Sequence, residues 1–65
     1  ISHPGTEMLY MIEGEILYRH GNEVFHLQPG DCLTLEGEIP HGPEKLIQVP
    51  IRLISMVNYS TYHDE

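Results

Sequence analysis

The chain has 65 residues, enough for one domain, and a domain of this size removes only about 60% of its unfolded surface from water. Ten acidic and three basic side chains give a formal net charge of −7, which repels phosphate backbones and excludes a basic surface for nucleic acid. No uncharged run in the sequence is long enough to cross a bilayer. With 40% hydrophobic residues, the chain is typical of a folded domain with a marginal core.

The first predicted element is a strand at residues 7–12, whose sequence Glu-Met-Leu-Tyr-Met-Ile is apolar on both alternating faces. This pattern is typical of a strand that is covered on each side. One face should line the core, and the other should meet a neighbouring chain or sheet. This strand and a last apolar strand at residues 51–57 together have more apolar surface than so small a domain can bury. We therefore expect a homodimer.

Residues 15–20 and 23–27 are predicted to form a hairpin, because Gly21 and Asn22 between them both tolerate positive φ. Two-residue hairpin loops fix the register of the paired strands, so the side chains can be assigned to faces. We expect a core face with Tyr18 opposite Phe25 and Ile16 opposite Leu27, and a polar face with Glu15, Arg19 and His26.

A tight turn is predicted at residues 28–31. Pro29 fixes φ at one central position, and Gly30 supplies the positive φ that a type II turn requires at the next. A strand over residues 31–35 and a second turn over residues 36–38 should follow.

The prolines of the last third restrict its structure. Pro40 interrupts a short segment at residues 39–41, and Pro43 and Pro50 limit the residues between them to a loop or an edge strand, because proline donates no ladder hydrogen bond. Five or six short strands separated by turns indicate an all-β barrel or sandwich. We place the barrel at residues 1–57 and an acidic tail at residues 58–65.

Two groups of residues carry a family resemblance. His3, Glu7 and Gly14 have the spacing His-x3-Glu-x6-Gly, which is similar to the latter part of the first motif of the cupin family. Gly30 precedes His41 by eleven positions, as in the second motif of that family. The resemblance covers roughly residues 3–57, and it implies a small cupin-type β-barrel, jelly-roll-like and incomplete in this chain.

The resemblance also implies a metal site. In the family, two histidines, a glutamate and a later histidine converge on one divalent metal ion, and His3, Glu7 and His41 match the last three, whereas Ile1 takes the place of the first. Such a donor set suits Fe, Mn, Ni or Zn. Because one donor is missing, we expect the metal to be weakly bound or absent.

Each of these residues also has a simpler interpretation. A histidine near a chain start is usually solvated, a carboxylate at a strand end can face solvent, and a histidine in a proline-rich turn can lie on the surface. We interpret His20, His26 and His63 as surface residues and assign no catalytic residue. The lone Cys32 excludes an internal disulfide and fits a reducing cytoplasm.

Three functions are compatible with these observations. The first is a sensing module that resembles the cupin domain following a helix-turn-helix in bacterial transcriptional regulators, binding a small molecule without turnover. Since translation does not start with Ile1, we expect such a DNA-binding segment before it. The second is a metal-dependent enzyme, a dioxygenase or an isomerase acting on a small polar molecule. The third is a structural cupin without a site. In the first, which we favour, the ligand pocket is lined by His3, Glu7, Leu9, Met11 and His41.

Overall fold

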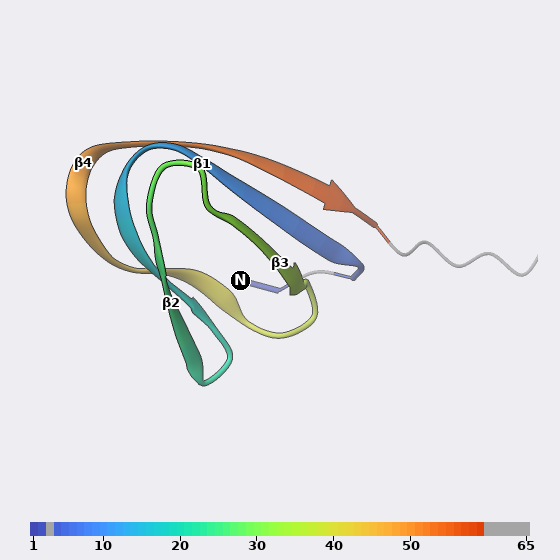
Figure 1. Ribbon diagram of the computed structural model, residues 1–65. Coiled ribbons are helices and arrows are strands. Elements are labelled where there is room, and N and C mark those ends of the chain that lie inside the picture. The colour runs from blue at the N-terminus through green and yellow to red at the C-terminus, as the bar shows by residue number, and fades with distance from the viewer. Residues whose placement is uncertain (3, 60–65) are drawn as a thin grey trace, which may run out of the picture.

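The computed structural model describes residues 1–2 and 4–59. They form one antiparallel sheet of four strands, and this part of the chain contains no helix, so none that could span a membrane. Figure 1 shows the sheet curling over along its length, like one part of a barrel wall. The all-β prediction is confirmed. The strands are β1 (Thr6–His20), β2 (Glu23–Leu27), β3 (Cys32–Glu36) and β4 (His41–Asn58).

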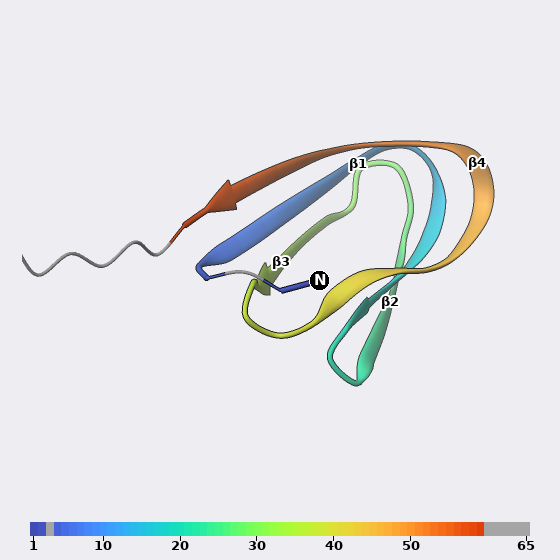
Figure 2. The ribbon, with the colours of Figure 1, turned by 180° about the vertical axis from the view of Figure 1, so that it is seen from behind.

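Strand β1 is the centre of the sheet. It pairs with β4 along one side, and on its other side with β3 over its first residues and with β2 over its last. Figures 1 and 2 show β1 and β4 curving over together, with β3 and the chain start beneath the curve. Because of this curvature, both ends of β1 contribute residues to one concave face.

The prediction of five or six short strands is wrong, because the described residues form four strands, two of which are long. Residues 7–12 and 15–20 are parts of β1, and residues 51–57 continue the strand that begins at His41. The strand β1 bends at Gly14 without ending there, and its register with β4 shifts on both sides of that residue.

Gly14 permits the bend for two reasons. Its φ is +90°, a conformation that costs glycine little, and the carbonyl oxygens of Pro50 and Gln48 lie 2.3 and 2.7 Å from where a Cβ atom would be. The backbone of β4 therefore passes directly over this position.

Strand β4 accommodates its prolines because it lies at the edge of the sheet. Of the two alternatives open for the residues between Pro43 and Pro50, the structure has the edge strand. Its last residue is Asn58. Residues 60–65, including His63 and most of the predicted tail, lie outside the described residues, as does His3.

The hairpin has the predicted register. Tyr18 lies opposite Phe25 and Ile16 opposite Leu27, whereas on the other face His26 contacts Glu15 at 2.6 Å. In the loop only Gly21 takes a positive φ, of +63°, which is the pattern of a type II′ turn.

Both later turns also form. The amide of Asp31 donates to the carbonyl of Gln28 at 2.9 Å, and Gly30 has a φ of +93°, as a type II turn requires. The amide of Ile39 closes the second turn on the carbonyl of Glu36 at 3.1 Å. This second turn places the start of β4 beside the first residues of the chain.

The core lies on the concave side of the sheet. Along β1 the inward positions Leu9 and Met11 are 2% and 0% exposed. The positions that alternate with them, Met8, Tyr10 and Ile12, lie on the outside and are partly exposed. The predicted core face is therefore confirmed. The buried apolar residues are Leu9, Met11, Ile16, Tyr18, Leu27 and Leu35.

Candidate functional site

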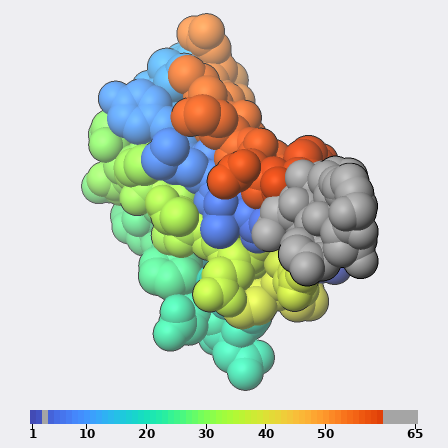
Figure 3. All heavy atoms as spheres, turned by 90° about the vertical axis from the view of Figure 1, so that its right-hand side faces the viewer, coloured from blue at the N-terminus to red at the C-terminus, as the bar shows by residue number. Residues whose placement is uncertain are grey.

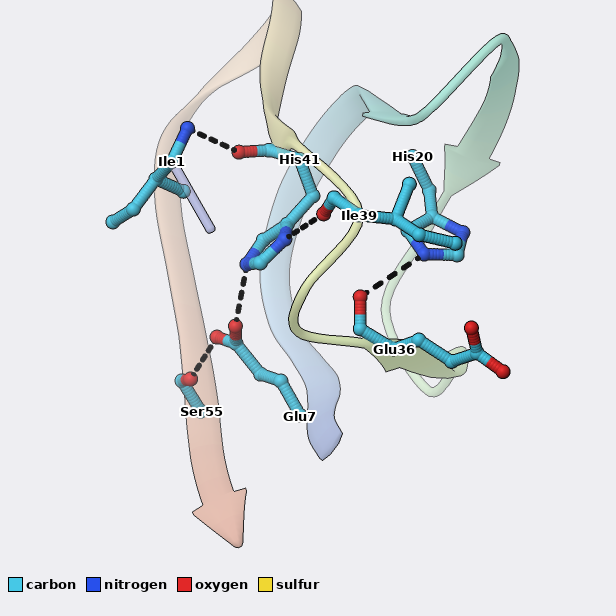
Figure 4. A network of polar contacts seen from close by, with 7 residues as sticks. All are labelled: Ile1, Glu7, His20, Glu36, Ile39, His41 and Ser55. Atoms are coloured by element: carbon cyan, nitrogen blue, oxygen red, sulfur yellow. Dashed lines mark hydrogen bonds and ion pairs between the residues drawn. The ribbon is translucent and has the colours of Figure 1, made fainter. Parts of the chain in front are cut away.

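Glu7 and His41 are in contact beside the buried apolar residues of this core. The Nε2 atom of His41 lies 2.9 Å from Oε1 of Glu7, although the two residues are 34 positions apart. The side chain of His41 is 1% exposed and that of Glu7 is 12% exposed, so this contact is largely removed from water. Strand β1 supplies the glutamate from its inward face, and the first residue of β4 supplies the histidine (Figure 4).

The second ring nitrogen fixes the orientation of His41. Its Nδ1 lies 2.8 Å from the carbonyl oxygen of Ile39, and because a carbonyl oxygen can only accept, Nδ1 carries a hydrogen. Nε2 therefore faces Glu7 with one proton between them. The pair is either an imidazolium with a carboxylate or a neutral imidazole with a protonated carboxyl group.

Ser55 completes the network from the other side. Its hydroxyl donates to Oε2 of Glu7, so that each carboxylate oxygen has a partner (Figure 4). Ser55 pairs with Leu9 in the sheet, and it therefore lies on the inward face of β4. The sequence analysis missed this residue. The available signal was a hydroxyl between the apolar residues Ile54 and Met56.

Tyr18 packs close to the pair. Its ring centroid lies 6.3 Å from that of His41, and the residue is 7% exposed. Burial raises the pKa of the Tyr18 hydroxyl, and the negative charge of Glu7 raises it further. The sequence analysis assigned Tyr18 to the core only, so its proximity to charged Glu7 is new information.

This coupling predicts a change in the alkaline behaviour of the chain. Because the folded state raises the pKa of Tyr18, its contribution to stability is complete below the ordinary pKa of 10.0 and is lost as pH rises through the raised value. The variant Glu7→Gln should lower the pKa of Tyr18 part of the way back, since burial persists without the charge. An NMR titration of the Tyr18 ring measures this. An unchanged pKa in Glu7→Gln would show that Glu7 carries no charge at this position.

The chain start lies alongside His41. The backbone amide of His41 donates to the carbonyl of Ile1 at 2.9 Å. A hollow of about 260 Å³ opens here, to which Ile1, Arg19, His41 and Glu44 contribute. Arg19 and Glu44 form an ion pair of 2.7 Å at this hollow, so one part of its otherwise mostly apolar wall is charged.

The predicted pocket residues have different environments. Glu7 and His41 lie in contact, whereas Leu9 and Met11 are buried in the core beside them. His3 lies outside the described residues. That these residues contact a ligand stays a prediction.

The donor atoms of Glu7 and His41 are compatible with a metal ion. Because Nδ1 of His41 is held as an N–H by Ile39, Nε2 can offer its lone pair, which is how ligand histidines are usually oriented. Within residues 1–2 and 4–59 there is no group of three His, Cys, Asp or Glu side chains that could hold a metal. Glu7 and His41 would hold the ion, with His3 as the third ligand that the sequence predicts.

Comparison with known proteins gives one family. The family model described as "Cupin domain" matches residues 1–57, which is most of the chain. No curated protein and no solved structure matches the chain.

Proposed function

This chain belongs to the cupin domain family, and from that premise we propose that it binds a small molecule at Glu7 and His41 without transforming it. In this proposal the bound molecule regulates a DNA-binding segment elsewhere in the same protein. The observation that carries the proposal is the hydrogen-bond network of Glu7, His41 and Ser55. Of the two alternatives, one places metal chemistry at this same site and the other assigns no site.

The network suits reversible binding. A polar ligand that offers a donor to Glu7 and an acceptor to His41 would exchange protein hydrogen bonds for ligand hydrogen bonds, so neither buried group would lose its partner. The hydroxyl of Ser55 donates to Glu7, which differs from the serine–histidine contact that activates a nucleophile. This arrangement supports recognition over turnover.

The charge supports a division of labour. With a net charge of −7, this segment is unsuited to contact DNA itself, so a regulator would need a separate basic segment, such as a helix-turn-helix. Ligand exchange at the start of β4 would shift that strand against β1, and this is how binding could reach the rest of a dimer. We place this regulator in the cytoplasm, where a free thiol such as Cys32 stays reduced.

The test uses the full-length protein. Operator binding is measured with and without each member of a metabolite library, and each metabolite that binds is then analysed for products. We expect one metabolite to change DNA affinity about 5- to 150-fold, the range of typical allosteric coupling, and to be recovered unchanged. Consumption of the metabolite, or a full-length protein without a DNA-binding segment, would overturn the proposal.

A metal-dependent dioxygenase or isomerase is the second candidate. It is favoured by one observation, the approach of Nε2 of His41 and a Glu7 oxygen, both of which can act as metal donors. A bound Fe, Mn, Ni or Zn ion would supply a Lewis acid at this position.

Elemental analysis distinguishes the two candidates. We expect no stoichiometric metal after dialysis of the purified protein against a chelator, since few protein donors converge here. A metal that survives dialysis and disappears in His41→Ala, but not in the surface control His26→Ala, would favour the enzyme. A structural cupin is the third alternative, and it predicts neither metal nor ligand binding.

A further inference from the structure

We propose that two copies of this chain associate through the convex outer face of the sheet, around the first half of β1. This goes beyond the proposed function, since the dimer could form whether or not the site binds a ligand. The surface, called the outer patch here, consists of Met8, Tyr10, Ile12, Ile54 and Met56, which are between 36% and 58% exposed.

The sheet register assembles the outer patch from β1 and β4, with β3 on the other side of β1. Met8 pairs with Thr34 of β3 and Met56 of β4, and Tyr10 pairs with Cys32 and Ile54. Figure 3 shows the first half of β1, in blue, between the orange end of β4 and the green of β3. The patch is therefore continuous across the sheet.

Charge favours a second copy as the occupant. The five side chains are uncharged and so are their cross-strand neighbours Thr34 and Cys32, although the chain as a whole carries a net charge of −7. Two such chains repel each other wherever their acidic surfaces meet. The nearest charges stand at the two ends of this face, where Glu36 pairs with Thr6, and Glu13 lies 3.8 Å from Arg52. An uncharged centre with a charged rim is typical of a protein interface.

A two-fold arrangement of two copies would fill a hollow at one end of this face. A hollow of about 440 Å³ lies at one end, and Tyr10 stands one row further along. The hollow is lined mainly by uncharged residues, with Glu7 as its one acidic member: Thr6, Glu7, Met8, Thr34, Met56, Val57 and Asn58. A two-fold axis between the rows of Met8 and Tyr10 would place each Tyr10 ring over the hollow of the other copy. Both copies would then use the same surface, as an isologous interface requires.

The area is also of the right size. With on the order of 200 Å² for a fully exposed large side chain, the five residues expose roughly 400 Å², which is about half of one side of a standard interface. The neutral rim residues Thr6, Thr34 and Asn58 would supply further area. Within the part of the chain that the structure describes, only six apolar residues are buried, so a marginal core gains most from such a partner.

Sedimentation of the wild type and two lysine variants tests the proposal. We expect a dimer for the wild type at tens of micromolar and at least a tenfold weaker association for Ile54→Lys. This variant has a smaller net negative charge, so general repulsion predicts the opposite change. The matched control Ile47→Lys alters a residue of the same strand outside the outer patch, 45% exposed against 53%, and should remain a dimer.

The thiol of Cys32 gives a second readout that needs no variant. Cys32 is exposed and lies opposite Tyr10 in the sheet. A dimer should therefore slow the reaction of its thiol with a maleimide at high protein concentration, and dilution should restore the faster rate. A wild-type monomer at tens of micromolar, or labelling that is independent of concentration, would overturn the proposal and leave this face to another segment or protein. Loss of the dimer in Ile47→Lys as in Ile54→Lys would also contradict it. These results are independent of ligand or DNA binding.

Discussion

The variant Gly14→Ala should be largely unfolded at 25 °C. A Cβ atom here would lie 2.3 Å from the carbonyl oxygen of Pro50 and 2.7 Å from that of Gln48, and both are backbone atoms that cannot rotate away. The φ of +90° adds strain for any residue with a side chain. Together we expect a loss of about 4 kcal/mol, comparable to the few kcal/mol that a core of this size supplies. Urea unfolding followed by circular dichroism measures it.

Two other glycines separate these contributions. Gly30 has a φ of +93° but no atom within 4 Å of a Cβ, and Gly42 has neither constraint. Gly30→Ala should therefore cost about 1 to 2 kcal/mol, and Gly42→Ala should change the free energy of unfolding by less than about 0.5 kcal/mol. If Gly14→Ala were no worse than Gly30→Ala, β4 would not pass closely over β1, and the curvature of the sheet would need another explanation.

The second large effect is expected at His41. His41→Ala should lower the free energy of unfolding by about 3 kcal/mol, because it leaves a cavity and removes a partner of the mostly buried Glu7 carboxylate. Glu7→Gln should cost only about 1 kcal/mol, since an amide can donate to Nε2 of His41 and still accept from Ser55. Denaturant unfolding measures these differences, and the use of one fixed protein concentration keeps the mass-action term of any association comparable between the variants.

A surface histidine provides the control. His20 is a partly exposed residue whose ring contacts the carbonyl of Glu36 at 3.3 Å, and His20→Ala should cost less than about 1 kcal/mol. The double variant Glu7→Ala/His41→Ala should be less destabilised than the sum of its single variants by more than about 1 kcal/mol. Additive single effects would contradict the direct contact between Glu7 and His41.

The elements that were predicted correctly depend on local rules. The register of the hairpin follows from Gly21 and Asn22, and the turn at residues 28–31 follows from Pro29 and Gly30, so neighbouring residues were sufficient. The separate strands predicted at residues 7–12 and 15–20 are one strand with a bend at Gly14. Whether a glycine ends or bends a strand depends on the backbone packed over it, which here comes from Gln48 and Pro50.

The candidate site shows the same difference. Glu7 and His41 were identified together because a family motif encodes their long-range contact, which no local pattern contains. Ser55 lies 48 positions from Glu7, and its role depends on the register of β4, which two prolines and several register shifts make unpredictable from sequence. The proximity of Tyr18 to His41 likewise depends on the curvature of β1.

The most direct test of the account follows the ring of His41 by NMR while a metabolite library is added to the protein. The account predicts that one polar metabolite shifts the signals of Nε2 and of the neighbouring Tyr18 ring, because it enters the hydrogen-bond network of Glu7 and His41. The same spectra should show that metabolite unchanged after prolonged incubation, and Glu7→Gln should weaken its binding. A metabolite that is converted to product, or one that binds without any change at His41, would contradict the account.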